Sequence, residues 1–377
     1  MTTNRELCFV FIGGTHQIYH LAPIAAQIAR NASRFAVRCI CADEEAERAL
    51  REIAGQMQAK TMEINRIPIS WVAKLAARAT GRPSAAKGPI LASIRWRARR
   101  SCAIVIPERT SAALRKMGWR RPLIHFRHGA GDRAPASEKR LRAFDLIVVP
   151  GEKDIQRALE QGIDRSRLRV GGYVKLDYLR IAPPAKEPLF GNSLPTVVYN
   201  PHFDARISSL GIAWDVIERF RRQDRYNLVF APHIRSMEKI SQADRQRFLS
   251  QAVANRIIID LGSPSLFDMR YTHAADIYLG DVSSQLYEFL SRPRPAVFLN
   301  SHGADWKSDP RYAGWHLGEV ADGPDTVLAA IDRAVANHQG KIEAQVSALK
   351  FAFGDFEGSI ERSADILIET ITSWEQT

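Results

Sequence analysis

The sequence is poor in cysteine and has no long apolar run. Its 377 residues contain four cysteines, Cys8, Cys39, Cys41 and Cys102. None forms a C-x-x-C pair, so neither a structural zinc motif nor a disulfide framework is expected, and buried reduced thiols are the simpler interpretation. No stretch approaches 18 consecutive apolar residues, and no basic segment precedes an apolar signal core. We therefore expect no spanning helix, no signal peptide and a cytoplasmic location.

Several catalytic signatures are also missing. The chain has no G-x-S-x-G elbow, no Walker A lysine motif, no H-E-x-x-H and no Asp-rich metal loop. Gly13-Gly14 follows an apolar run but lacks the full G-x-G-x-x-G spacing of dinucleotide-binding proteins. We expect chemistry that uses no cofactor and no tightly bound metal.

The positive charge is concentrated in one part of the chain. The formal net charge is +12, and the segment from Arg66 to Arg121 holds fourteen Lys and Arg but only one acid, Glu108. The helical piece Ile69 to Ala79 within it mixes Trp71 with basic residues, a pattern suited to an anionic membrane surface. We expect peripheral contact with the inner face of the cell membrane. A solvated basic face is the alternative.

The first half of the chain alternates short apolar runs with helical periodicity, which predicts a parallel sheet. The runs expected to be strands are Leu7 to Ile12, Phe35 to Cys41, Ala103 to Ile106, Leu123 to Phe126, Leu146 to Val149 and Val170 to Tyr173. Helices are expected at His16 to Arg30, with Thr15 as a cap, and at Ala42 to Gln56.

A second α/β pattern follows a linker with three prolines, Ile181 to Leu194. Its expected strands are Thr196 to Tyr199, Leu228 to Ala231, Ile257 to Asp260, Ile277 to Gly280 and Ala296 to Leu299. Its expected helices are Ala213 to Arg222, Ala243 to Val253, Ser284 to Ser291 and Pro324 to Asn337. We predict a domain over residues 1–182, a second over 195–358, and a final helix, 359–377, that crosses back to the first. The fold class is α/β with two Rossmann-like, doubly wound parallel sheets facing across a cleft.

Polar residues follow the strands of the second domain. Asp281, Ser283 and Ser284 open a helix after a buried strand, and helix starts favour phosphate groups. Glu288 lies about one turn later and is predicted to accept hydrogen bonds from a ribose. An Asp/Ser cap with a solvated glutamate is the structural alternative.

Three further strand-end loops carry imidazoles. Pro232-His233-Ile-Arg235 is predicted to bind a diphosphate. Asn200 and His202 also follow a strand and are predicted to bind the same donor. In the first domain, His128 is the predicted base, and Gly129 permits close backbone approach. His16 and Arg133 are predicted to lie on the acceptor side. Structural loop residues are the alternative for each.

The pattern from Phe126 to Asn300 resembles the CDP-glycerol glycerophosphotransferases of teichoic-acid synthesis. The matching elements are a His-Gly loop at His128-Gly129, a Pro-His motif at Pro232-His233, and Asp281-x-Ser283-Ser284 followed by Glu288 and Pro293. The chain is more distantly similar to other enzymes of the GT-B fold, such as UDP-N-acetylglucosamine 2-epimerases.

The resemblance implies transfer of glycerol phosphate, or of a sugar, from a CDP- or UDP-activated donor to a hydroxyl acceptor. A lipid-linked or glycan acceptor is expected, with His128 and His233 as catalytic residues. Two alternatives stay open. One is a GT-B epimerase that needs no acceptor. The other is a nucleic-acid-binding protein whose basic segment, with Trp96 and Trp119, grips phosphates, although no nucleic-acid-binding module is visible and no nucleic-acid partner is expected.

Overall fold

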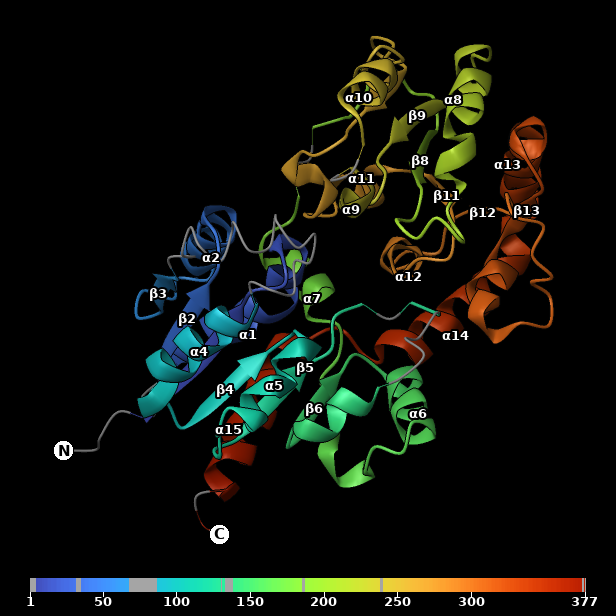
Figure 1. Ribbon diagram of the computed structural model, residues 1–377. Coiled ribbons are helices and arrows are strands. Elements are labelled where there is room, and N and C mark those ends of the chain that lie inside the picture. Colours follow the sequence, from blue (N-terminus) through green and yellow to red (C-terminus); the bar gives the residue numbers. More distant parts are fainter. Residues whose placement is uncertain are drawn as a thin grey trace. The chain divides into compact units, whose positions relative to one another are not determined.

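The computed structural model describes residues 5–31, 35–67, 87–129, 131–132, 138–184, 187–237, 240–374 and 376 (Figure 1). The chain forms two compact units. Unit 1 comprises Met1–His128, Pro135–Ala182 and Ala352–Thr377, and unit 2 comprises Gly129–Ala134 and Pro183–Phe351. The expected helix at Ile69 to Ala79 and the acceptor-side Arg133 lie outside the described residues. Within the described residues, no helix is both long and apolar enough to cross a bilayer.

Unit 1 is built on a sheet of seven parallel strands in the order β3-β2-β1-β4-β5-β6-β7. The strands are β1 (Arg5–Phe11), β2 (Phe35–Cys41), β3 (Glu63–Arg66), β4 (Ala103–Ile106), β5 (Leu123–Phe126), β6 (Leu146–Val149) and β7 (Leu168–Val170). The central strands are buried along their length, as expected for a parallel sheet covered on both faces.

Helices cover both faces of this sheet. One face packs against α1 (Ile18–Asn31), α2 (Glu44–Gln56), α7 (Val174–Ile181) and α15 (Ser359–Trp374). The other packs against α4 (Lys87–Arg97), α5 (Ala113–Lys116) and α6 (Glu152–Glu160). Alternate residues of a strand point to opposite faces, so Leu7 and Phe9 join the first core, whereas Cys8 and Val10 join the second.

Unit 2 is built on a sheet of six parallel strands in the order β10-β9-β8-β11-β12-β13. The strands are β8 (Thr196–Asn200), β9 (Asn227–Phe230), β10 (Ile257–Ile259), β11 (Ile277–Gly280), β12 (Ala296–Leu299) and β13 (Glu319–Ala321). One face packs against α8 (Ala213–Arg221), α9 (Ile234–Met237) and α13 (Val327–Ala336). The remaining helices are α10 (Gln242–Leu249), α11 (Arg270–Ala274), α12 (Gln285–Phe289) and α14 (Ile342–Phe353).

The opposite face of the second sheet is aromatic. Tyr278 lies 5.6 Å from Phe289 of α12 and 6.3 Å from Phe298, measured between ring centroids. Trp315, in the 3-10 segment Pro310–Leu317, stacks on Phe298 at 5.9 Å. These rings fix the short helix α12 against the sheet, directly after the loop that carries Asp281.

The sequence predicted the two parallel α/β sheets correctly, but some details were wrong. The last strand of unit 1 ends at Val170, because Gly172 has a φ of 93° and leaves the extended region. The helix expected at Ser284 to Ser291 is only Gln285–Phe289. Gly14, and not Thr15, precedes the first turn, which is a 3-10 turn at Thr15–Gln17 that leads into α1.

Each sheet has one point at which the strand order reverses. In unit 1 this point lies between β1 and β4, and in unit 2 it lies between β8 and β11. Open α/β sheets bind ligands at the carboxyl ends of the strands that flank such a point. The loops after β1, β4, β8 and β11 are therefore the first places to look for a site.

Candidate active site

The buried carboxylate of Asp281 holds the loop that follows β8 in unit 2. Asp281 is fully buried, and its Oδ2 accepts hydrogen bonds from the backbone N–H groups of His202, at 2.8 Å, and Ser209, at 2.9 Å. Burial raises the pKa of Asp281 to about 7, although these hydrogen bonds oppose the shift. Asp281, predicted as a nucleotide ligand, thus contacts the loop that presents His202.

Two imidazole rings of unit 2, those of His202 and His233, lie close together. The rings of His202 and His233 are 5.9 Å apart. The Nδ1 of His202 accepts a hydrogen bond from the Asp204 backbone at 3.0 Å, and the Nδ1 of His233 accepts one from the Arg235 backbone at 3.2 Å. A neutral imidazole that accepts at Nδ1 carries its proton on Nε2. Both rings therefore present an N–H donor, which suits an anionic ligand.

A guanidinium and an aromatic ring complete this cluster. Arg235 is exposed, and its guanidinium lies 4.0 Å from the centroid of the Phe203 ring. The Phe203 ring lies 4.8 Å from that of His233. Sequence analysis missed Phe203, because a single phenylalanine in a loop carries no spacing signal. Asn200 differs from its neighbours, since it is buried and donates to the carbonyl of Ala231, which ties β8 to β9.

The two serines after β11 differ in accessibility. Ser283 is buried, and its hydroxyl accepts a hydrogen bond from the Gln285 backbone at 3.2 Å in the turn directly before α12. Ser284 is half-buried, and Glu288, on the same helix, is 4% exposed. Of the three residues predicted here as ligands, Ser284 is the most accessible to solvent.

The glycines after His128 belong to unit 2 and pack against Ser284. A Cβ added to Gly129, whose φ is 72°, would lie 3.2 Å from the Ser284 hydroxyl oxygen, and one added to Gly131 would lie 3.5 Å from the Ser284 nitrogen. The buried Asp132 accepts hydrogen bonds from the Tyr287 hydroxyl, at 2.6 Å, and from the Gly314 backbone, at 2.8 Å. Sequence analysis missed Asp132, which holds this segment against α12.

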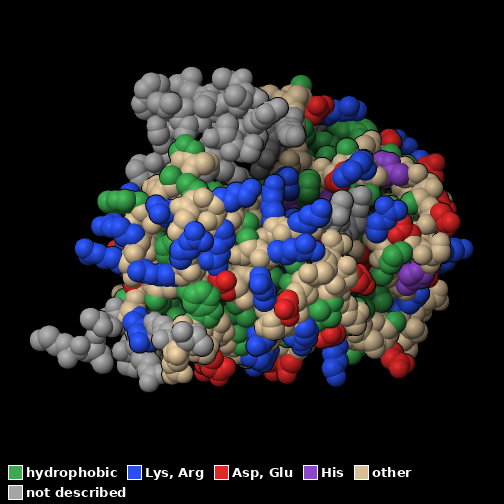
Figure 2. Space-filling model, turned by 60° about the horizontal axis from the view of Figure 1, so that its bottom comes forward, with side chains coloured by type: hydrophobic (Ala, Val, Ile, Leu, Met, Phe, Trp, Pro, Cys, Tyr) green, Lys and Arg blue, Asp and Glu red, His purple; other side chains and the backbone are tan. Residues whose placement is uncertain are grey.

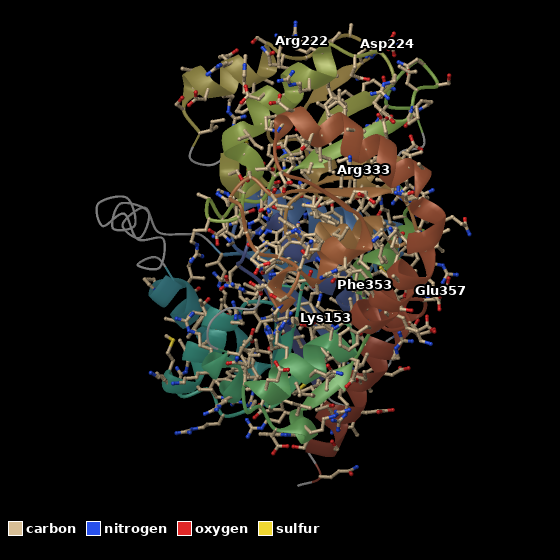
Figure 3. All side chains as sticks on the ribbon, turned by 90° about the vertical axis from the view of Figure 1, so that its right-hand side faces the viewer. Lys153, Arg222, Asp224, Arg333, Phe353 and Glu357 are labelled. Carbon is tan, nitrogen blue, oxygen red and sulfur yellow. The ribbon has the colours of Figure 1, made fainter. Side chains whose placement is uncertain are left out.

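Three imidazoles gather at the carboxyl edge of the first sheet. The His128 ring lies 5.8 Å from that of His16 and 6.1 Å from that of His20. Tyr173 packs against His20 at 5.1 Å and stacks on Phe353, which Figure 3 labels, at 3.7 Å. Among the described residues, no group of three or more His, Cys, Asp or Glu side chains is arranged to hold a metal ion.

The imidazoles of His20 and His128 are neutral near pH 7. Burial, aided by the nearby His16 and Arg127, lowers the pKa of His128 to about 3, and the Pro107 carbonyl only partly opposes this. Burial also lowers the pKa of His20, helped by the charge of Lys175. A neutral imidazole has a lone pair that can accept a proton, although a pKa of about 3 makes His128 a weak base.

A buried ion network lies next to His128. Arg127 pairs with Asp154 of α6 at 2.8 Å and with Glu138 at 3.1 Å, and both carboxylates are buried. Burial raises the pKa of Asp154, while the Arg127 charge opposes the shift. The network fixes the backbone at the end of β5, from which His128 projects.

No family model matches the sequence, and no curated protein matches it. Solved structures do match it across nearly its whole length. The wall teichoic acid polymerase TagF aligns with a TM-score of 0.62 at 12% identity, covering 98% of this chain and 90% of that one.

Two further structures align about equally well. S. aureus MnaA with UDP has a TM-score of 0.65 at 11% identity, covering 98% of this chain and 97% of that one. The UDP-GlcNAc 2-epimerase from Neisseria meningitidis, bound to UDP-GlcNAc, has a TM-score of 0.61 at 12% identity, covering 98% and 100%. The chain has the GT-B fold. Identities this low establish the architecture and leave the function to the site itself.

Proposed function

We propose that this GT-B protein is a transferase that uses a nucleotide-activated donor. It moves glycerol phosphate, or a sugar, from a CDP- or UDP-linked donor to a hydroxyl acceptor. The observation that carries the proposal is the cluster at the carboxyl ends of β8 and β9, next to the reversal point of the second sheet, where His202 and His233 both present Nε2–H donors beside the exposed Arg235. Three donors of this kind are suited to the oxygens of a diphosphate.

Each residue of the proposed site has its own role in the transfer. For a CDP-glycerol donor, the acceptor oxygen attacks the glycerol-bearing phosphorus while the bond from that phosphorus to the CMP oxygen breaks. His128 takes the acceptor proton on its imidazole. His202, His233 and Arg235 stabilise the charge that CMP carries away, and Ser284 adds a hydroxyl donor. Such preorganised donors are commonly the largest single contribution to catalysis.

Binding of nucleotides in the absence of acceptor tests the proposal directly. We expect CMP, CDP, UMP or UDP to raise the melting temperature of unit 2, since a ligand at 100 times its Kd stabilises the folded state by about 2.7 kcal/mol. His233→Ala and Arg235→Ala should reduce this shift, whereas Arg206→Ala, an exposed arginine that pairs with Asp204 in the same loop, should keep it. A chain whose melting temperature responds to none of the four nucleotides contradicts the proposal.

The identity of the nucleotide chooses between donor classes. A response to CMP and CDP favours glycerol phosphate transfer, and a response to UDP favours sugar chemistry. The alternative activity is that of a 2-epimerase, which the alignment with the Neisseria enzyme favours. An epimerase converts UDP-N-acetylglucosamine with no acceptor present, so incubation with this donor alone separates the two activities.

The basic surface of unit 1 supports a membrane-bound acceptor. Trp96 of α4 is 61% exposed, and the Arg99 guanidinium lies 4.4 Å from its ring centroid. The exposed cations around it are Arg95, Arg99, Arg100, Lys116, Arg120 and Arg121, and no Asp or Glu occurs from residue 87 to 107 or from 109 to 121. Figure 2 shows more Lys and Arg than Asp and Glu on the side that it brings forward. Trp119 is buried, so it cannot stack on a nucleic-acid base.

Vesicle binding tests this surface, which we name the α4 surface (Arg95 to Arg100 with Lys116, Arg120 and Arg121). We expect co-sedimentation with vesicles that contain phosphatidylglycerol, reversed by salt, and no co-sedimentation with pure phosphatidylcholine. Each arginine removed should weaken binding roughly fivefold, from about 1 kcal/mol per charge. Trp96→Ala should weaken binding, and Trp374→Ala, another exposed tryptophan, should not. Binding that is indifferent to anionic lipid and salt contradicts the membrane role.

A further inference from the structure

Phe203 contacts all three of the groups that are proposed to bind the diphosphate. Its ring centroid lies 4.3 Å from that of His202 and 4.8 Å from that of His233, and the guanidinium carbon of Arg235 lies 4.0 Å from it. The residue is 36% exposed, so part of the ring faces solvent. A phenyl ring offers no hydrogen bond to a phosphate, so its contribution to anion binding comes through the three groups that it contacts.

Backbone interactions bring the ring and the guanidinium together. Phe203 lies in the loop after β8, and Arg235 lies after β9, in α9. The backbone N–H of His233 donates to the carbonyl of Pro201 at 3.0 Å, which joins the two loops. The buried carboxylate of Asp281, which accepts hydrogen bonds from two backbone N–H groups of the first loop, fixes that loop in turn. The contact between the ring and the guanidinium is therefore built on a fixed backbone.

The contact with Phe203 uses none of the N–H groups of Arg235. A guanidinium carries five N–H donors, and a cation–π contact attracts its positive charge without accepting from any of them. The carboxylate next to Phe203 in the chain, Asp204, is bound by Arg206 instead, at 2.6 Å and 2.9 Å. Among the residues that the structure describes, Arg235 forms no ion pair. A carboxylate partner would compete with a phosphate for the same N–H groups, whereas a phenyl ring does not.

We propose that Phe203 is a positioning residue that holds the Arg235 guanidinium beside His202 and His233, so that the three donors are in place before a diphosphate binds. This inference rests on the proposed function, because it assigns the cluster to the diphosphate of the donor. An exposed arginine otherwise samples many rotamers. Fixing one such side chain in advance raises affinity about two- to tenfold.

The ring current of Phe203 provides a test of the geometry that needs no ligand. Protons above the face of an aromatic ring resonate upfield of their usual positions, so NMR should find the side-chain protons of Arg235 shifted in wild-type protein. Arg235→Gln identifies these signals by their loss. Phe203→Leu should return them to the usual range, and Phe203→Tyr should keep them shifted. Ordinary shifts for Arg235 in wild-type protein overturn the proposal.

Inorganic pyrophosphate is the probe for binding, because it offers a diphosphate without a nucleobase. Calorimetric titration in about 0.15 M salt screens the exposed cations of the α4 surface. We expect Phe203→Leu to weaken pyrophosphate binding about two- to tenfold. Phe203→Tyr keeps an aromatic face and should bind within about twofold of wild type. If Phe203→Leu weakens the binding of CDP and UDP but not of pyrophosphate, the ring acts on the nucleobase and the proposal is overturned.

A double-mutant cycle shows whether Phe203 acts through Arg235. It is measured with CDP or UDP, whichever wild-type protein binds more tightly. In the Arg235→Gln background the guanidinium is absent, so Phe203→Leu should cost little further affinity. An equal loss in both backgrounds overturns the positioning role.

Trp214→Leu is the matched control, since it removes a ring that lies 3.9 Å from the guanidinium carbon of another exposed arginine of unit 2, Arg247. It should leave the binding of pyrophosphate and of the nucleotide unchanged. A loss equal to that of Phe203→Leu means that removing any such ring disturbs unit 2, which overturns the specific role of Phe203.

Failure of this inference and failure of the proposed function give different results. If wild-type protein binds neither pyrophosphate nor any of the four nucleotides while the Arg235 signals are shifted, the function fails, and the positioning role fails with it although the geometry stands. If wild-type protein binds a nucleotide and Phe203→Leu binds pyrophosphate as tightly as wild type, the proposed function stands and the role of Phe203 is overturned.

Discussion

At the scale of single residues, the second sheet holds a carboxyl group whose ionisation opposes folding. The pKa of Asp281, raised to about 7 by burial, exceeds the value of about 3.9 for an unfolded aspartate, so the folded state binds this proton more tightly. The stabilisation that Asp281 gives by binding this proton is therefore complete below about pH 4 and is lost as the pH rises to about 7. His128 acts in the opposite direction, because its pKa of about 3 makes the folded state more stable as the pH rises to about 6.5.

Asp281→Asn should separate these two effects. The asparagine keeps an oxygen for the His202 and Ser209 backbones but cannot ionise. Between pH 5 and 7, the free energy of unfolding of the variant, measured with urea, should rise relative to that of wild type by at most about 1.4 kcal/mol per pH unit. Asp260→Asn should show no such trend between pH 5 and 7, because hydrogen bonds, chiefly from Ser263, hold the pKa of Asp260 below its ordinary value despite its burial, so this carboxylate is ionised in both states over that range. Parallel pH curves for wild type and Asp281→Asn would contradict the assignment.

At the scale of elements, the ion network around Arg127 joins β5 to α6. Arg127→Met removes the cation and leaves the buried carboxylates of Asp154 and Glu138 without it. Breaking a buried pair from one side costs about 3–5 kcal/mol. Chemical unfolding of unit 1 should report a loss of this size. Arg333→Met, at a half-exposed arginine labelled in Figure 3 that pairs with Glu319 at 3.3 Å, should cost less than about 1 kcal/mol. Equal losses of stability in the two variants would show that burial does not determine how much these ion pairs contribute.

Local sequence determines most strands of this protein but not all of them. Strands such as β4 and β6 are short apolar runs, buried on both faces, and the sequence predicts them within a residue. The edge strands β3 and β13 escape prediction, because Glu63–Arg66 is polar and half-exposed and Glu319–Ala321 has only three residues. Their extended form comes from pairing with β2 and β12, which periodicity along the chain does not contain.

The residues of the candidate site also divide into those that the sequence predicts and those that it does not. Residues directly after a strand, such as His128, His202 and His233, are predictable, because the carboxyl ends of parallel strands share one edge. Phe203 and Asp132 are not, since each acquires its contact only when distant segments meet. The sequence predicts which polar residues follow the strands, and tertiary contacts decide which atoms face each other.

At the scale of the whole molecule, the chain leaves unit 1 at Ala182 and returns to it at Ala352. The returning segment ends in α15, whose Leu367 and Ile371 are buried in the same core as α1. The carboxylate of Asp177 accepts hydrogen bonds from the Gly358 backbone, at 3.1 Å, and the Ile360 backbone, at 2.9 Å, at the start of this helix. Unit 1 is thus complete only after the last helix has been made, whereas the long segment of unit 2 is continuous from Pro183 to Phe351.

This topology predicts unequal effects of mutations in the last two helices. Leu367→Ala removes a fully buried side chain from unit 1 and should lower its stability by about 2–5 kcal/mol. Val346→Ala, on α14 in unit 2, alters a side chain in a residue that is 49% exposed and should change stability by about 0.5 kcal/mol or less. In thermal unfolding, Leu367→Ala should lower the transition of unit 1 and leave the nucleotide-dependent transition of unit 2 in place. If both transitions fall together by the same amount, the two units unfold as one cooperative body, which contradicts this prediction.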